Sequence, residues 1–317
     1  MILIDNIVRA APAIHREVVD EHMADRYLQR WKKEAGVTSS TDDITAETDI
    51  AIEEELRIKL EEEFGTTSGF VGEETGDHAE PGQPCWVVDL VDGSTIRLIG
   101  GELWSSVLAH LDPATQNIDF VSVYQPTRET QYLYVTGRRS WKETLVHEKE
   151  RLPRRRATFL SPSRSSALGE LRGCAYIPAR YKERMPGMDG KLEGIFRYIH
   201  HPEVKDGRDY GIANVRPGSG SASLMACHVA EGVMHFQVLY QQGAYDLLGF
   251  AVAKGADCPT SAGLQRHDAG DIGNITTVGV ERVNGAVYNN EATKKLVNAL
   301  LHHPEVSTID ELTALMQ

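Results

Sequence analysis

The hydrophobic pattern of the N-terminal third predicts helices followed by short strands. From residue 4 to about residue 35, apolar residues recur at helical spacing among charged ones, which indicates one or two amphipathic helices. A polar stretch beginning at Thr41 is typical of a helix N-terminus, and the Glu-rich segment 46–64 keeps isoleucine and leucine at helical intervals. The apolar runs 70–72 and 86–88 predict strands, and each leads directly into acidic residues. We therefore expect acidic side chains at the ends of two strands.

Alternating polar and apolar positions predict antiparallel strands in the middle of the chain. These segments are 107–111, 120–124 and 131–135, with turns at Asp112-Pro113 and Pro126-Thr127. Further on, a Gly- and Ser-rich stretch from residue 218 precedes an apolar helix that ends near residue 229. A strand-like segment then covers 233–240, and a second apolar helix opens at Tyr245 and continues to Lys254. This alternation of strand and helix indicates a mixed α/β (α+β) architecture.

A shift in composition near residue 150 predicts a boundary between two lobes, 1–149 and 150–317. Arginine and lysine outnumber acids between Arg151 and Arg184, a segment that includes the run 154–156. This basic segment could lean over an anionic substrate. A solvated surface that balances the acidic first half is the simpler interpretation.

Composition and charge limit the classes of function. The 317 residues are 41% hydrophobic and 25% charged, as in ordinary soluble globular proteins. A formal net charge of −13 argues against nucleic acid or an anionic membrane as the main partner. The four cysteines are widely spaced, which excludes the paired motifs of zinc and redox sites. A charge at Asp5 interrupts the N-terminus too early for a signal peptide, and no apolar run approaches the ~20 residues that span a bilayer. We therefore expect a cytoplasmic protein.

The candidate chemistry is concentrated in acidic residues that follow an apolar run. Asp89 and Asp92 are three residues apart, and Gly93, Ser94 and Thr95 follow at once. Two like charges at this spacing repel each other, and a cation between them would offset that repulsion. The same residues are also typical of an acidic turn that closes a strand, so the segment by itself leaves both interpretations open.

Two further acids favour a metal site. If the fold brought Glu73 and Asp246 to Asp89 and Asp92, four carboxylates would destabilise one another unless protons or hard cations neutralised them. Oxygen ligands are what Mg²⁺ prefers, and histidine and thiolate, which would indicate zinc, are absent from these positions.

A pair of magnesium ions is suited to phosphoryl transfer. Two ions held ~3.5–4 Å apart can contact both the attacking water and the leaving oxygen of a phosphate ester. Backbone N–H groups in the turn 93–95 could then receive the phosphate. The hydroxyl of Ser94, linked to a carboxylate such as Asp49, could orient and deprotonate the water.

The order of these motifs resembles that of the inositol monophosphatase superfamily. This superfamily of magnesium-dependent, often lithium-sensitive phosphatases includes fructose-1,6-bisphosphatases and 3′(2′),5′-bisphosphate nucleotidases. The motifs that carry the resemblance are, in chain order, Ile44-Thr45-Ala46-Glu47-Thr48-Asp49, Gly72-Glu73-Glu74, Trp86-Val87-Val88-Asp89-Leu90-Val91-Asp92-Gly93-Ser94-Thr95, Gly220-Ser221-Ala222 and Ala244-Tyr245-Asp246. Each motif alone is weakly specific, but their order and spacing together are not expected by chance.

The resemblance implies a role for each matching residue. Glu73, Asp89 and the Val91 carbonyl would hold one Mg²⁺, and Asp89, Asp92 and Asp246 a second. A weaker third site would use Glu73 and waters. Ser94, with Glu73 or Asp49, would activate water. Phosphate and substrate contacts are expected from Gly93, Ser94, Thr95, Ser221, Ala222, Arg97 and Leu239. The implied fold is a layered αβαβα sandwich, usually a homodimer, with two or three Mg²⁺ per subunit and inhibition by Li⁺.

Departures from the family pattern bear on the substrate. Inositol phosphatases usually carry Asn-Phe where this chain has Ile96-Arg97, and a glutamate that contacts a ring hydroxyl where it has Leu239. Leucine accepts no hydrogen bond, so discrimination of a polyol would be lost at that position. Leu90 and Ser94 replace the usual proline and threonine, and Tyr245 the usual tryptophan, which should leave catalysis intact.

Three interpretations of function follow. The first is a Mg²⁺-dependent phosphomonoesterase acting on a small polyol, cyclitol or sugar phosphate. The second is a fructose-1,6-bisphosphatase or a 3′(2′),5′-bisphosphate nucleotidase that uses the same metals. The third is an inactive family member that binds phosphorylated ligands, although such a protein has no need to retain every ligand oxygen.

Overall fold

The computed structural model describes most of the chain. The described residues are 4–34, 41–66, 68–80, 83–98, 100–112, 117–146, 154–165, 171–176, 204–205, 208–209, 214–217, 220–242, 245–262 and 283–302. Of Asp49 and Thr95 only the backbone is described, so the roles expected of their side chains lie outside the described part of the structure.

A large sheet forms the first half of the described structure. Its eight strands run in the order β2-β1-β3-β4-β5-β6-β7-β8; β1 and β3 are parallel, and the other neighbours are antiparallel. The strands are β1 (Gly69–Gly72), β2 (Gly76–Asp77), β3 (Cys85–Asp92), β4 (Ser105–Asp112), β5 (Asn117–Gln125), β6 (Thr130–Val135), β7 (Trp141–Val146) and β8 (Arg154–Phe159). A 3₁₀ turn, η1 (Pro126–Arg128), joins β5 to β6.

A second sheet is built from the C-terminal half. Its five described strands run in the order β12-β9-β13-β15-β14, with β9 parallel to both of its neighbours. The strands are β9 (Arg172–Tyr176), β12 (Asn214–Pro217), β13 (Phe236–Gln242), β14 (Thr260–Ala262) and β15 (Val283–Tyr288). A separate two-stranded ribbon consists of β10 (Val204–Lys205) and β11 (Arg208–Asp209).

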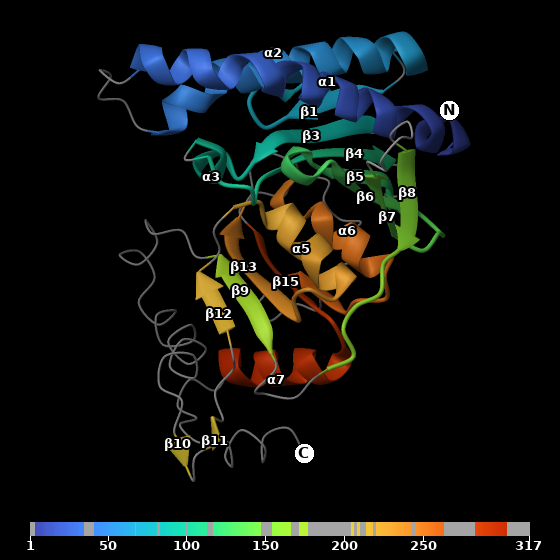
Figure 1. The fold of residues 1–317 in the computed structure, drawn as a ribbon. Coiled ribbons are helices and arrows are strands. Elements are labelled where there is room, and N and C mark those ends of the chain that lie inside the picture. The colour runs from blue at the N-terminus through green and yellow to red at the C-terminus, as the bar shows by residue number, and fades with distance from the viewer. Residues whose placement is uncertain are drawn as a thin grey trace.

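The helices separate and cover the two sheets. They are α1 (Ile4–Glu34), α2 (Thr41–Phe64), α3 (Ser94–Leu98), α5 (Ala222–Glu231), the 3₁₀ turn η4 (Tyr245–Leu247), α6 (Gly249–Lys254) and α7 (Glu291–His302). Figure 1 shows α1 and α2 on the outer face of the large sheet, α5 and α6 between the sheets, and α7 on the far face of the second sheet. The predicted layered αβαβα sandwich is therefore confirmed.

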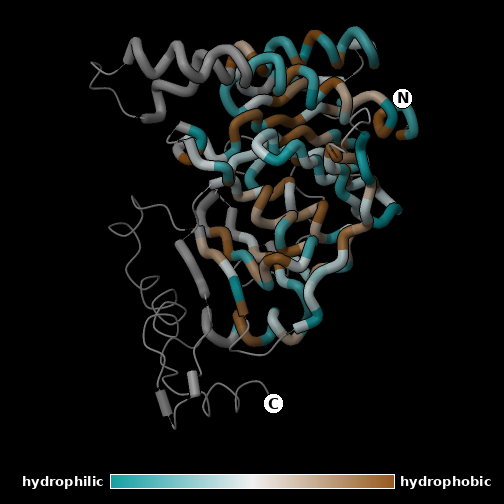
Figure 2. Tube along the Cα trace, in the orientation of Figure 1, coloured by the Kyte–Doolittle hydropathy of each residue, from teal (hydrophilic) through white to brown (hydrophobic). Residues whose placement is uncertain are grey.

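Two hydrophobic cores explain this layering. Strand β3 is buried along its whole length, so its alternating side chains enter both cores. Trp86, Val88 and Leu90 pack with the helices α1 and α2, whereas Cys85 and Val87 pack with α5 and α6. Figure 2 shows the corresponding hydrophobic segments in the strands and in the helices between the sheets. By the same alternation, Asp89 faces the α5 side.

Most elements match the sequence-based predictions, with a few differences in extent. Helix α2 begins at Thr41 and so includes the polar stretch expected to precede it, and its buried residues include Ile52, Leu56 and Leu60. Strand β3 continues to Asp92, so Asp89 lies inside the strand; its pairing with β4 shifts register between Asp89 and Asp92.

The regions around the predicted lobe boundary and the cysteines can also be described. The large sheet extends past residue 150, because the basic run 154–156 lies in β8, a mostly exposed edge strand. The four cysteines are free and buried. None of the described helices combines the length and the apolarity that a membrane span requires.

Candidate metal centre

Three aspartates converge where the large sheet meets the layer of α5 and α6. Asp89 and Asp92 come from the C-terminal part of β3, and Asp246 comes from η4, more than 150 residues later. One carboxylate oxygen from each lies within 4.8 Å of the others. Asp89 and Asp92 are buried and Asp246 is half-buried. The predicted convergence of these acids therefore occurs in the structure.

The N-terminus of α5 holds Asp92 in place. The Ser221 hydroxyl donates to Asp92 Oδ2 at 2.6 Å, and the backbone amides of Ala222 and Ser223 donate to its two oxygens at 2.9 and 2.8 Å. Ser221 also caps the helix, accepting from the Leu224 amide at 2.8 Å. Amides at a helix N-terminus favour a negative charge. Ser221 and Ala222, which the sequence assigned to substrate, therefore position a carboxylate of the cluster.

Close backbone approach explains two glycines beside this contact. Gly93 has φ +95°, and a Cβ there would lie 2.7 Å from the Ser221 nitrogen. Gly220 has φ +98°, and a Cβ there would lie 2.0 Å from the carbonyl oxygen of Leu103, which accepts from the Ser221 amide. A larger residue at Gly93 would push the end of β3 away from α5, and one at Gly220 would push the start of α5 away from the loop at Leu103. Glycine at position 93 thus allows Asp92 to reach the helix, and glycine at position 220 allows the helix to begin against Leu103.

Glu73 approaches the cluster from the loop after β1. The residue as a whole is exposed, but its carboxyl group hydrogen-bonds to Tyr245 and to Asp89. Loss of water around the carboxyl group, together with the charges of Glu74 and Asp92, raises the pKa of Glu73 to about 7. A hydrogen bond between two carboxyl groups needs a proton, so Glu73 and Asp89 share one in the absence of a cation.

The buried aspartates are also shifted toward the protonated form. Burial, followed by repulsion from Glu73, Asp92 and Asp246, raises the pKa of Asp89 well above its ordinary value. Burial likewise raises the pKa of Asp92, although the hydrogen bonds from α5 act in the opposite direction. The charges that raise the pKa of Asp89 are thus those of neighbouring carboxylates. A bound cation would offset this repulsion.

The turn after β3 carries the predicted nucleophile-activating hydroxyl. Ser94 Oγ donates to the Val91 carbonyl at 2.9 Å, so the hydroxyl and a predicted ligand oxygen are adjacent. Gly93 accepts from the amides of Ile96 and Arg97 at 2.9 and 3.1 Å, which starts the short helix α3. The expected link from Ser94 to Asp49 stays a prediction, because the Asp49 side chain is outside the described residues.

Two residues expected at the substrate have other surroundings. Arg97 lies with its guanidinium 5.5 Å from the centre of the Trp104 ring, a cation–π contact. Leu239 is fully buried in the core between the sheets, so it presents no surface to a ligand. Their contacts with a substrate stay predictions.

The sequence analysis missed a buried carboxylate that supports the loop of Glu73. Glu53 of α2 is 1% exposed and accepts from the Glu74 amide at 3.3 Å and from the Thr75 amide and hydroxyl at 2.9 and 2.7 Å. The available signal was its position: Glu53 lies three residues before Leu56, on the apolar face of the helix. An acid on a buried helix face requires a partner.

The donor set fits a hard divalent cation. Asp89, Asp92 and Asp246 offer only oxygen, and Glu73, hydrogen-bonded to Asp89, adds a further carboxyl group. Mg²⁺ takes carboxylate, carbonyl and water oxygens. Magnesium would thus be held chiefly by the three aspartates.

Comparison with known proteins relates the chain to a protein family. The model of the inositol monophosphatase family matches residues 4–249. A search among curated proteins found no match. The Thermotoga maritima IMPase TM1415 is 15% identical over 96% of this chain and 98% of its own, with a TM-score of 0.62.

Two staphylococcal structures are similar to the same extent. Inositol monophosphatase-II from Staphylococcus aureus MSSA476 is 18% identical over 98% of this chain and 97% of its own, with a TM-score of 0.64. SaIMPase-II with 2′AMP bound is 18% identical over 98% of both chains, also with a TM-score of 0.64. At these identities the likeness concerns the fold, whereas the family model covers well over half of the sequence. The chain therefore belongs to the inositol monophosphatase family.

Proposed function

We propose that this protein is a Mg²⁺-dependent phosphomonoesterase acting on a small polyol, cyclitol or sugar phosphate. The observation that carries the proposal is the convergence of Asp89, Asp92 and Asp246. The pKa values of Asp89 and Asp92 are raised, and after burial the main cause at Asp89 is repulsion from neighbouring carboxylates. Family membership supports phosphatase chemistry of the metal-dependent type.

Bound Mg²⁺ would supply positive charge to the phosphate and to the attacking water. The protein's own part is to hold the ligands and to handle protons. The α5 amides and Ser221 fix the orientation of Asp92, and Glu53 fixes the loop that carries Glu73. Ser94 Oγ, which donates to the Val91 carbonyl, keeps its lone pairs available to accept from a water molecule.

Hydrolysis needs one proton removed and one delivered. Water attacks phosphorus, the bond from phosphorus to the ester oxygen breaks, and inorganic phosphate and an alcohol leave. A carboxylate takes the proton of the attacking water, and Glu73 is the candidate within the described residues because its carboxyl group adjoins the cluster through its hydrogen bond to Asp89. The departing alkoxide receives a proton from solvent water.

A phosphate-release screen tests the proposal. Purified protein is assayed against a panel of phosphomonoesters and bisphosphates, with and without MgCl₂, alongside the Asp246→Asn variant. Magnesium-dependent release that Asp246→Asn abolishes is the expected result. Release that does not require magnesium, or that survives this substitution, would refute the proposed centre.

The alternative is a bisphosphate nucleotidase or fructose-1,6-bisphosphatase on the same centre. It is favoured by the 2′AMP bound to SaIMPase-II and by Arg97, a cation three residues after Ser94. A substrate with a second phosphate should lose affinity more steeply with salt than a monophosphate does. Comparing the salt dependence of KM for the best mono- and bisphosphates therefore separates the two activities.

Inositol 1-phosphate should be a poor substrate by comparison with the best sugar phosphate. Leu239 replaces the glutamate expected from the family pattern and is fully buried in the core, so this position offers a ring hydroxyl neither a hydrogen-bond acceptor nor exposed surface. Efficient hydrolysis of inositol 1-phosphate in the same panel would show that this position does not determine specificity.

A further inference from the structure

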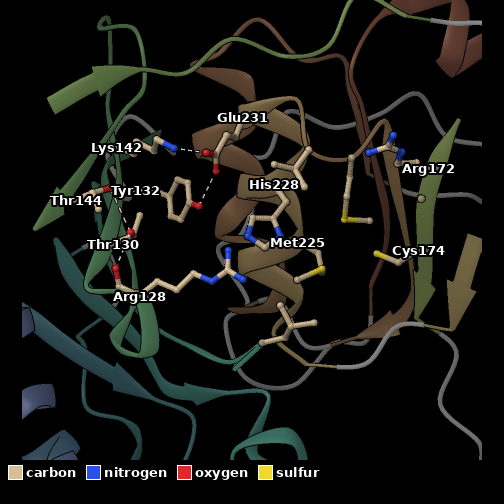
Figure 3. A pocket seen from close by; sticks show the side chains of 14 residues that line it. Arg128, Thr130, Tyr132, Lys142, Thr144, Arg172, Cys174, Met225, His228 and Glu231 are labelled. Atoms are coloured by element: carbon tan, nitrogen blue, oxygen red, sulfur yellow. Dashed lines mark hydrogen bonds and ion pairs between the residues drawn. The ribbon is translucent and has the colours of Figure 1, made fainter. Parts of the chain in front are cut away.

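A cavity lies along α5, away from the aspartate cluster. Its volume is about 810 Å³, within the range of small-molecule sites. Figure 3 shows it between η1, β6 and β7 of the large sheet on one side and β9 on the other, with α5 behind. The polar wall from α5 is formed by His228 and Glu231 in its last turn, whereas Asp92 is bound at its first turn. A ten-residue helix is about 15 Å long, and no proposed metal ligand is among the described residues that line the cavity.

The charge of the cavity is opposite to that of the whole chain. Arg128, Lys142 and Arg172 line it, and Glu231 is the single carboxylate among its described lining residues. The formal net charge of the chain is −13. A local excess of cations in an acidic protein would attract an anion.

Glu231 is already neutralised within the protein. Lys142 forms an ion pair with it, and the Tyr132 hydroxyl donates to its other oxygen at 2.8 Å. Both oxygens of Glu231 and the charge of Lys142 are therefore engaged. The charges that a ligand would meet are those of the two arginines.

Arg128 and Arg172 are available to an anion. Arg128 pairs only loosely with Glu102, at 3.7 Å between side chains that are 59% and 67% exposed, and such pairs contribute little. Among the described residues, no carboxylate forms an ion pair with Arg172. Figure 3 shows the Arg128 side chain extending toward His228 from one side, and Arg172 on the other side of α5. Guanidinium groups bind carboxylate and phosphate through paired N–H donors.

Apolar side chains form part of the remaining wall, which also includes Thr130 and Thr144. Met225 and Met234 provide adaptable surface, and Leu103 and Val233 extend it. Burial lowers the pKa of His228 to about 4, so its ring is neutral at pH 7 and adds a hydrogen-bonding group without charge. An inorganic ion would leave this apolar surface uncovered, whereas an organic anion would bury it.

We propose that this cavity binds a small organic anion. Its phosphate, sulfonate or carboxylate group is held by Arg128 beside His228, and its apolar body packs on Met225 and Met234. Arg172, on the opposite wall, adds positive charge that attracts the anion. The site is independent of the aspartate cluster and does not depend on phosphatase activity.

Fluorescence titration with 8-anilinonaphthalene-1-sulfonate tests the site directly. This probe joins a sulfonate to an apolar body, and N-phenyl-1-naphthylamine is its uncharged counterpart. The Arg128→Ala/Arg172→Ala double variant should bind the sulfonate at least about tenfold more weakly, with little change for the uncharged probe. Arg138→Ala is the matched control, because that arginine is exposed and pairs with Asp5 outside the cavity. Equal loss of both probes, or no loss, would overturn the proposal.

Two further measurements confine the result to this cavity. Val233 is 49% exposed at the rim, so Val233→Glu adds a negative charge without burying it and should also weaken binding of the sulfonate. Unchanged binding in this variant would contradict the location. Competition with phenylphosphonate and with benzoate distinguishes phosphate-like from carboxylate ligands, and failure of both to displace the probe would count against an anion site.

Discussion

Asp92→Asn separates the two roles that the structure assigns to this residue. In the native protein, Asp92 Oδ2 accepts from Ser221 Oγ and from the Ser223 amide, and Oδ1 accepts from the Ala222 amide. The best orientation of an asparagine keeps two of these bonds and turns its NH₂ group against the Ala222 N–H. The variant thus loses at least one charge-assisted hydrogen bond and the favourable interaction of a carboxylate with the helix N-terminus.

The expected loss of stability is modest because a second effect opposes it. One charge-assisted hydrogen bond contributes about 1.5–3 kcal/mol, and the helix-terminus interaction about 0.3–1 kcal/mol. Removing the charge also relieves repulsion on Asp89, whose pKa is raised partly by Asp92. The metal-free variant should therefore fold, with a free energy of unfolding lower by about 1–3 kcal/mol.

The decisive assay is thermal unfolding across a magnesium titration. A ligand at 100 times its Kd stabilises the folded state by about 2.7 kcal/mol. Wild-type protein should show a rising Tm with MgCl₂, and Asp92→Asn should show almost none, with phosphate release abolished. Asp5→Asn, at a 79% exposed side chain, is the control and should behave as wild type.

An Asp92→Asn protein that gains as much from magnesium as wild type would refute the metal centre. Asp246→Asn supplies a second test that leaves the α5 contacts of Asp92 in place. It should remove the response to magnesium at a smaller cost in stability.

Three further predictions concern other parts of the structure. Ser94→Ala should lower kcat by about 10²-fold or more with little change in KM, because the hydroxyl orients and activates the attacking water. Steady-state kinetics measure both constants, and an effect on KM alone would remove Ser94 from the mechanism. Gly220→Ala should lower the free energy of unfolding in urea by about 3 kcal/mol or more, since its Cβ would lie 2.0 Å from the Leu103 oxygen. Gly137→Ala is the control: its φ is also positive but the space around it is open, so it should cost about 1–2 kcal/mol. Equal costs for the two variants would contradict the steric argument. Burial lowers the pKa of His15 to about 3, so below pH 6.5 the unfolded chain binds a proton that the folded chain does not. The free energy of unfolding should therefore fall by about 2 kcal/mol as the pH is lowered from 6.5 to 5. Urea unfolding of wild type and of His15→Asn at pH 6.5 and 5 measures the contribution of His15. An equal change in the free energy of unfolding for the two proteins would argue against a neutral buried imidazole.

Much of the architecture follows from local sequence patterns. The apolar run before Asp89 predicts a buried strand, and the alternation of its side chains places Trp86 and Val88 in one core and Val87 in the other. The helical spacing of Ile52 and Leu56 predicts α2. These properties depend on the spacing of apolar residues along the sequence, which is a local pattern.

The acidic character of the centre could also be predicted from the sequence. Acids without nearby basic partners indicate a hard cation, and the order of the motifs indicates the family. The roles of Ser221 and Glu53 could not be predicted in this way. Ser221 meets Asp92 across 129 positions, and Glu53 meets Thr75 from another layer of the fold.

The sequence by itself thus determined the layers, the acidic residue types and the family. Only the tertiary structure decided that α5 binds Asp92 through its first turn, that Leu239 points into the core and that Arg128 and Arg172 line a cavity with Met225 between them. The physical reason is that each of these contacts joins residues from different elements. Their distances depend on how the two sheets pack against α5 and α6, which no local pattern of polar and apolar residues specifies.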